Sequence, residues 1–289
     1  MGKVISIINM KGGVGKTTLT LGFADLLADQ GKSILLIDAD PQFNATQAML
    51  DCYKINDSDE EHNYYTRDIL PNSKTIYRLF RPQVDMSQAY TTPTSDDIII
   101  NLKTNLDMLC GDLNLVLVNK SNNNSYVKRI RNFIEDNHLK DKYDYIFIDC
   151  PPTLTIYTDS ALMASDYYLI PNRIDRYSIV GIDSLQKAVG SLINEERIPL
   201  KCIGLVYTMI DNDISPKQMA IKENFESKSV VNDLDIFSSM MTTAKNIQVG
   251  KSGTIPTRYQ KSREDMEAIC AELLQKLDTA EDEEAWHYV

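Results

Sequence analysis

The sequence predicts an α/β fold in which a doubly wound, mainly parallel sheet is flanked by helices in a single domain. Two observations support this prediction. Short apolar runs, typical of strands that are buried on both faces, alternate along the chain with longer segments of helical spacing. Several of these runs also end in aspartate or in a glycine-rich turn, as strands do where a parallel sheet carries its ligand site. We assign residues 1–280 to this domain, with a surface insertion near 51–73 and an acidic tail at 281–289.

The bulk composition excludes several classes of protein. A net charge of −11 argues against a surface that coats nucleic acid, so any contact with DNA must come from a local patch. The five cysteines are scattered and odd in number, which favours a reducing cytoplasm over a disulfide framework. The first residues lead directly into an apolar strand rather than a secretory signal, and no apolar run is long enough to span a bilayer. We therefore expect a cytoplasmic protein without a membrane partner.

The first apolar run, 4–8, leads into the glycine-rich turn 10–18, and a helix follows that stops at Gly31. Such a turn is a phosphate cradle, because its backbone amides turn inward and the helix dipole favours an anion. The spacing predicts that Lys16 reaches the β- and γ-phosphates of a nucleotide and that the Thr17 hydroxyl binds Mg²⁺. The turn differs from the P-loop pattern in two ways. Met10 takes the place of the first glycine, and a second lysine, Lys11, stands at the front.

Two later apolar runs end in aspartate. The run 33–37 is followed by Asp38-Ala39-Asp40-Pro41-Gln42, and the run 145–148 ends at Asp149, before Cys150-Pro151-Pro152. An apolar strand that closes on aspartate is the Walker B pattern, whose carboxylate binds Mg²⁺ directly or through water. Each aspartate by itself is as well explained as a cap of a turn or helix. Together with the glycine-rich turn, they predict a nucleotide site at the carboxyl edge of the sheet.

These three motifs together resemble those of the deviant Walker A ATPases, the ParA/MinD family, whose loop reads K-G-G-x-G-K-[ST]-T. The resemblance covers nearly the whole chain and implies a P-loop NTPase-like fold with ATP and Mg²⁺ as cofactors. It implies that Lys11 reaches across a homodimer to the partner's ATP and that Asp40 orients the attacking water. The implied catalytic residues are Lys11, Lys16 and Asp40, and the implied metal-site residues are Thr17, Asp38, Asp40 and Asp149. The implied nucleotide-binding residues are Lys11, Gly12, Gly13, Val14, Gly15, Lys16, Thr17 and Thr18, with Thr208, Met209 and Pro256 near the adenine.

The other elements follow the same alternation of strand and helix. We predict helices at 75–80, 127–138, 182–193, 216–225 and 263–277, and strands at 98–100, 106–109, 145–149, 167–171 and 202–207. The stretch 51–73 is acidic and without periodicity at its centre, which predicts a surface loop, and 81–95 contains two prolines and should be irregular. The acidic tail should be frayed.

The resemblance further predicts a ParA-like partition ATPase, associated with the nucleoid, that serves plasmid or chromosome segregation. In this reading ATP bridges two subunits, and the dimer holds non-specific DNA. A centromere-binding, ParB-like protein then triggers hydrolysis to ADP and phosphate, and release. The candidate DNA contacts are basic residues late in the chain: Lys251, Arg258, Lys261 and Arg263. The alternative interpretation is that these residues are solvated charges at helix ends without a DNA partner.

Three other classes stay open to different degrees. A MinD-like ATPase that positions a membrane-bound or protein cargo would carry a basic C-terminal helix, whereas this tail is acidic. A P-loop metabolic ligase that resembles dethiobiotin synthetase would not need the D-x-D-P-Q motif. An iron–sulfur carrier would need paired cysteines such as C-x-x-C, and the five cysteines do not pair at that spacing.

Overall fold

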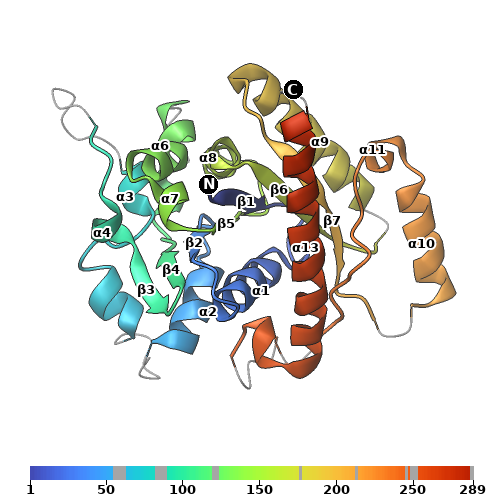
Figure 1. Cartoon of the computed structure of the whole chain (residues 1–289), viewed down its shortest axis with the longest axis horizontal. Coiled ribbons are helices and arrows are strands. Elements are labelled where there is room, and N and C mark those ends of the chain that lie inside the picture. The colour runs from blue at the N-terminus through green and yellow to red at the C-terminus, as the bar shows by residue number, and fades with distance from the viewer. Residues whose placement is uncertain are drawn as a thin grey trace.

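A seven-stranded sheet forms the centre of the molecule (Figure 1). The computed structural model describes residues 1–54, 63–81, 90–118, 124–175, 178–211, 214–244, 247 and 253–286, with side chains as far as residue 280. The strands lie in the order β3-β4-β2-β5-β1-β6-β7, and all pairs are parallel except β3 with β4. Their bounds are β1 (Lys3–Ile7), β2 (Ile34–Asp38), β3 (Ile100–Lys103), β4 (Leu106–Leu109), β5 (Tyr145–Asp149), β6 (Tyr167–Arg173) and β7 (Lys201–Thr208).

Helices cover both faces of this sheet. The main ones are α1 (Lys16–Asp29), α2 (Asn44–Tyr53), α6 (Arg129–Asp136), α8 (Ile156–Ala164), α9 (Ser178–Glu196), α10 (Pro216–Glu226) and α13 (Gln260–Trp286). Short helices are α3 (Tyr77–Phe80), α4 (Ser95–Ile98), α5 (Leu115–Val118), α7 (Leu139–Lys142), α11 (Ser229–Asn232), the π-helix η1 (Tyr65–Ile69) and the 3₁₀ helices η2 (Asn124–Lys128) and η3 (Pro256–Arg258). One apolar cluster joins α1, α2 and α13 to the sheet, and a second joins α3, α6, α8 and α9 to the opposite face.

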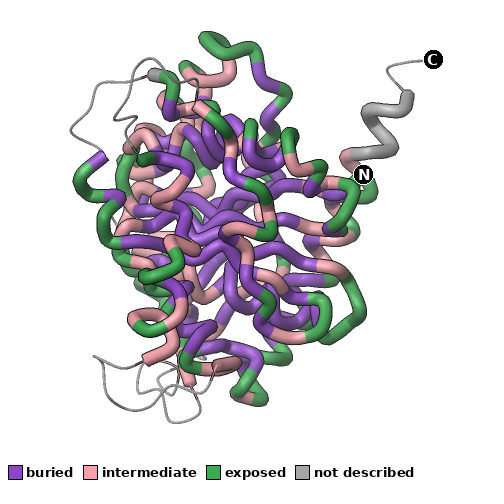
Figure 2. Tube along the Cα trace, turned by 90° about the vertical axis from the view of Figure 1, so that its left-hand side faces the viewer, coloured by how far each residue is buried: buried purple, intermediate pink, exposed green. Residues whose placement is uncertain are grey.

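This two-sided cover explains the apolar runs of the sequence. All five residues of β2 are buried, and β1 and β5 each expose only their first residue in part. Figure 2 shows the buried residues concentrated in the middle of the molecule. Because helices pack on both faces, these strands need apolar residues at every position and show no alternation. The predicted fold class is confirmed.

Several predicted boundaries were wrong. The strand expected at 98–100 begins only at Ile100, because Ile98 closes α4, which Thr94 and Asp97 begin with a capping box. The predicted surface loop is smaller than 51–73, since α2 continues to Tyr53 and η1 buries Ile69. The centre of that stretch, 55–62, lies outside the described residues.

The C-terminal helix is longer than expected. Helix α13 begins at Gln260 and continues to Trp286, so the first six residues of the expected frayed tail are helical. Residues 287–289 lie outside the described part of the chain. Within the described residues, no helix combines the length and the apolar character that crossing a membrane requires.

Candidate nucleotide-binding site

The glycine-rich turn connects the end of β1 to the start of α1, as predicted. Gly13 and Gly15 have φ angles of 69° and 83°, a region that only glycine enters without strain. A Cβ atom added to Gly12 or Gly13 would meet nothing within 4 Å, so the inner side of the turn faces open space. The turn therefore leaves room for a phosphate group beside the N-terminus of a fourteen-residue helix.

Lys16 opens this helix and is buried, with only 7% of the residue exposed. Its Nζ donates a hydrogen bond to the carbonyl oxygen of Lys11, 3.2 Å away, so the side chain folds back along the turn. Burial lowers the pKa of Lys16, while the charges of Asp149 and Asp40 oppose that shift. Burial disfavours the charged form of Lys16, and a phosphate anion in the adjoining turn would stabilise that form.

Asp38 and Asp149 end neighbouring strands and face each other in register. Burial is the main cause that raises the pKa of both carboxyls, and the charge of Asp149 raises that of Asp38 further. Asp149 accepts hydrogen bonds from the hydroxyls of Thr17, at 2.7 Å, and Thr20, at 3.3 Å. The predicted metal-site residues Thr17 and Asp149 are therefore in direct contact.

Asp38 plays a more structural part than expected. Its Oδ2 accepts from both the amide and the hydroxyl of Thr46, at 2.8 and 2.7 Å, and its Oδ1 accepts from the amide of Asp40 at 3.2 Å. These bonds anchor the start of α2 and the turn that carries Asp40. They leave Asp38 to act on a metal through its charge, or through water, more readily than as a direct ligand.

The donor set fits a magnesium ion that is shared with phosphates. Among the described residues, no group of three or more His, Cys, Asp or Glu is arranged to hold a metal by itself. Mg²⁺ in phosphate sites takes only one or two protein oxygens and completes its shell with phosphate and water. A cation beside the Thr17–Asp149 pair would also relieve the repulsion between the buried carboxylates.

Asp40 lies in a turn that is held from three sides. Its Oδ1 accepts from the amide of Gln42 at 2.9 Å, and the amide of Phe43 donates to its carbonyl at 2.8 Å. Phe43 has a φ angle of 41°, and its ring stacks on Tyr65 with centroids 5.0 Å apart. A Cβ atom at Gly111 would lie 2.6 Å from the Cβ of Phe43, so Gly111 is needed for this close approach. Sequence reasoning found Asp40 and missed this support.

A cavity of about 50 Å³ adjoins the helix end of the glycine-rich turn. It is lined by Gly15, Thr18, Thr208, Met209, Met241, Thr242, Thr243, Ala244 and Ile247. The Thr208 hydroxyl donates to the carbonyl of Val14 at 2.7 Å, which ties the end of β7 to the turn. Thr208 and Met209 therefore lie beside the glycine-rich turn, and their contact with the adenine stays a prediction. The stretch 241–244 was missed, because it has no motif and reaches the site only through pairing with the end of β7.

Pro256 is not among the residues that line this cavity, and its contact with the base stays a prediction. It begins η3, which packs beside α1. The next residue, Thr257, donates its hydroxyl to the buried carboxylate of Asp25, well along α1 from the phosphate turn. The same carboxylate accepts from Tyr53 and pairs with Lys103. Thr257 thus belongs to a hydrogen-bonded cluster around Asp25.

The expected DNA patch is largely neutralised by neighbouring side chains. Lys261 pairs with Asp265 at 3.0 Å, and Arg263 pairs with Glu267 at 3.1 Å. The Arg258 guanidinium lies over the ring of Tyr53, 5.3 Å from its centroid. Lys251 lies outside the described residues. Lys261 and Arg263 are therefore each paired with a carboxylate on the same helix.

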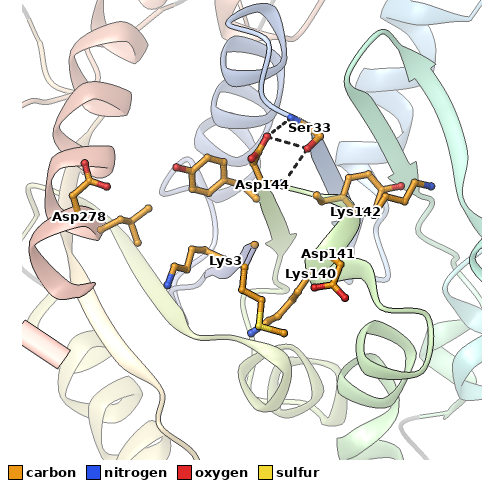
Figure 3. A pocket seen from close by; sticks show the side chains of 12 residues that line it. Lys3, Ser33, Lys140, Asp141, Lys142, Asp144 and Asp278 are labelled. Carbon is orange, nitrogen blue, oxygen red and sulfur yellow. Dashed lines mark hydrogen bonds between the residues drawn. The ribbon is translucent and has the colours of Figure 1, made fainter. Parts of the chain in front are cut away.

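A larger open cavity, of about 440 Å³, lies at the amino edge of the sheet (Figure 3). Its polar residues are mostly satisfied within the chain: Ser33 donates to Asp144, and Lys140 pairs with Asp166 at 2.6 Å. It contains none of the predicted site residues. Ligands of parallel sheets bind at the carboxyl edge, so we place the functional site at the smaller cavity beside the turn.

Comparison with known proteins agrees with the motifs. An AAA domain family, AAA_31, matches residues 2–202. The chain is 35% identical to the sporulation initiation inhibitor protein Soj of Bacillus subtilis over 211 residues, which is 73% of this chain and 74% of Soj. It is 30% identical to the chromosome partitioning protein ParA of Myxococcus xanthus over 223 residues, 77% of this chain and 70% of ParA.

The chain belongs to the ParA/Soj family. Its fold matches that of a putative plasmid partition protein from Borrelia burgdorferi bound to AMPPNP, with a TM-score of 0.72 and 22% identity, over 96% of this chain and 100% of the other. At that identity the likeness concerns the fold. The ParA/Soj membership rests on the sequence relatives and confirms the predicted resemblance to the ParA/MinD family.

Proposed function

We propose that this ParA/Soj protein is a partition ATPase that binds ATP with Mg²⁺, dimerises around it and hydrolyses it to ADP and phosphate. The observation that carries the proposal is the junction of the two motifs. The turn that ends in buried Lys16 is joined to the Walker B aspartate through the hydrogen bond from Thr17 to Asp149. A buried ammonium beside the two buried carboxylates of Asp149 and Asp40 is a costly arrangement that is typical of a functional site.

Each residue then has a defined task. The open turn and Lys16 bind the phosphates, and the cavity beside Thr208 and Met209 receives the base side of the nucleotide. Thr17, with Asp149 behind it, would hold Mg²⁺, and the ion would supply positive charge that stabilises the phosphates. Asp40, fixed by the amide of Gln42, orients the attacking water and accepts its proton.

Lys11 is assigned to the partner subunit's nucleotide. Its own turn already presents Lys16 to the phosphates, so a second lysine at the front of the turn serves a neighbouring site better than its own. Its side chain is about one-third exposed and therefore accessible to a second copy of the chain. In the symmetric dimer that follows, each site is complete only when both subunits are present.

The cargo is proposed to be DNA, held non-specifically by the dimer and released when a ParB-like partner stimulates hydrolysis. The paired state of Lys261 and Arg263 favours a second candidate, a protein assembly as cargo, because these side chains must leave Asp265 and Glu267 to bind phosphates. DNA binding measured over a salt series with ADP and with ATP separates the two. Binding that depends on ATP and weakens with salt supports DNA, and no binding at low salt supports the protein cargo.

Sedimentation velocity with ADP, ATP and a non-hydrolysable ATP analogue tests the proposed function. We expect a monomer with ADP and a dimer with ATP or the analogue, and the Lys16→Ala variant should stay monomeric in all three because it no longer binds the nucleotide tightly. A sedimentation coefficient that is the same with every nucleotide would contradict the proposal.

A further inference from the structure

The side chain of Lys11 has a charged partner within its own protomer. Its Nζ forms an ion pair with Oδ2 of Asp175, which lies just after β6. The two side chains are 34% and 26% exposed, so the pair lies at the rim of the site and not in the core. A residue from the segment after β6 therefore holds the lysine that is assigned to the partner subunit.

The backbone around this pair is fixed independently of the pair. The Lys11 amide donates to Oδ1 of Asn9 at 2.9 Å, and Nδ2 of Asn9 donates to the carbonyl of Pro171 at 2.8 Å. Lys16 binds the Lys11 carbonyl from the other side. The turn is thus tied to β6 through its main chain, and the Lys11 side chain can leave Asp175 without moving the turn.

We infer that Asp175 is a positioning residue that keeps Lys11 within its own protomer and competes with the partner's phosphates for it. The inference rests on the proposed cross-subunit role of Lys11. One ammonium cannot pair fully with Asp175 and with a nucleotide across the dimer, so dimerisation exchanges the first contact for the second. Asp175 therefore sets the threshold at which ATP assembles the dimer.

The expected size of this effect is modest. Pairs with this degree of exposure are screened by solvent, so releasing Lys11 should tighten the ATP-dependent dimer by about two- to fivefold. A stronger ion pair between Lys11 and Asp175 would prevent dimer assembly, and a weaker one would not affect it.

A double-mutant cycle provides the test. The dimer dissociation constant is measured by sedimentation with the non-hydrolysable ATP analogue for wild type, Asp175→Asn, Lys11→Ala and the double variant. Asp175→Asn should tighten the dimer in the wild-type background and have no effect once Lys11 is alanine. Asp183→Asn is the matched control, because Asp183 pairs with Lys187 at 2.7 Å on the exposed face of α9.

The outcomes separate this inference from the proposed function. If Lys11→Ala dimerises as wild type does, the cross-subunit role itself is wrong. If Lys11→Ala weakens the dimer but Asp175→Asn leaves it unchanged or weaker, or tightens it equally in both backgrounds, the positioning role is overturned.

Amine labelling of the ligand-free monomer gives a second readout that a purely structural role would not move. Mass spectrometry after brief acetylation should show faster modification of Lys11 in Asp175→Asn, with Lys187 unchanged. Asp183→Asn should show faster modification of Lys187, with Lys11 unchanged. Equal labelling of Lys11 in wild type and in Asp175→Asn would contradict the pair.

Discussion

Replacing Lys16 with methionine separates the affinity for nucleotide from the stability of the ligand-free fold. The substitution keeps most of the stem of the side chain and removes the ammonium of a residue that is only 7% exposed, and whose pKa is lowered by burial. Within the ligand-free protein, the ammonium donates to the Lys11 carbonyl at the rather long distance of 3.2 Å. The fold therefore loses little when the charge is removed, and it sheds the cost of burying that charge.

The nucleotide complex loses far more. A hydrogen bond to a charged group contributes about 1.5–3 kcal/mol, and in the proposed complex Lys16 would make one to each of two phosphates. Their loss corresponds to about 3–6 kcal/mol, or a weakening of at least about 100-fold at 1.4 kcal/mol per factor of ten. Isothermal titration with ATP and Mg²⁺ measures the affinity, and urea unfolding measures the stability.

The exposed Lys32, at the far end of α1, provides the control variant Lys32→Met, which should bind ATP as wild type does. An ATP affinity of Lys16→Met within threefold of wild type would refute the reasoning. So would a large loss of ligand-free stability, because Lys16 would then be a structural residue.

Three further predictions concern the turn of Asp40, the cluster around Asp25 and the DNA patch. Asp40→Ala should bind ATP and dimerise but lose hydrolysis, as measured by phosphate release, and a variant that cannot bind ATP would show that Asp40 is structural. Asp25→Asn should destabilise the fold by about 3 kcal/mol in urea unfolding at pH 7, because it leaves Lys103 without its buried partner. Burial acts to raise the pKa of Asp25, but hydrogen bonds from Lys103 and other side chains lower it overall. The loss of stability in Asp25→Asn should therefore be full above about pH 4 and shrink only as the pH falls through the lowered pKa. An equal loss of stability at all pH values would contradict the charge argument. Finally, Arg263→Gln should reduce DNA binding only weakly in a mobility assay, since Glu267 already pairs with this charge. A loss of DNA affinity greater than tenfold would show that Arg263 contacts DNA despite this pair.

The central part of the site could be predicted because its signals are local. The turn 10–18, the aspartates that end β2 and β5, and the buried strands before them are each contiguous stretches whose chemistry is visible in the sequence. The parallel pairing of β2 with β5 then brings Asp38 opposite Asp149, as strand order requires.

The parts that were missed depend on contacts between distant segments. The stretch 241–244 lines the cavity because it pairs with the end of β7, and no motif marks it. The stacking of Phe43 on Tyr65 joins the Asp40 turn to η1, which composition alone presents as part of a surface loop. By contrast, the ion pairs of Lys261 with Asp265 and of Arg263 with Glu267 could have been predicted, because each pair is at i, i+4 spacing on one helix.

Mixing two inactive variants tests the central claim most directly. If Lys11 acts across the dimer and Asp40 acts in its own subunit, a heterodimer of Lys11→Ala and Asp40→Ala contains one complete site and one that lacks both residues. Equal amounts should therefore restore ATP hydrolysis to about one quarter of the wild-type level, because half of the dimers are mixed and each has one working site of two. Each variant alone should stay at background. Hydrolysis that remains at background after mixing, while both variants still bind ATP, would contradict a shared site between two subunits.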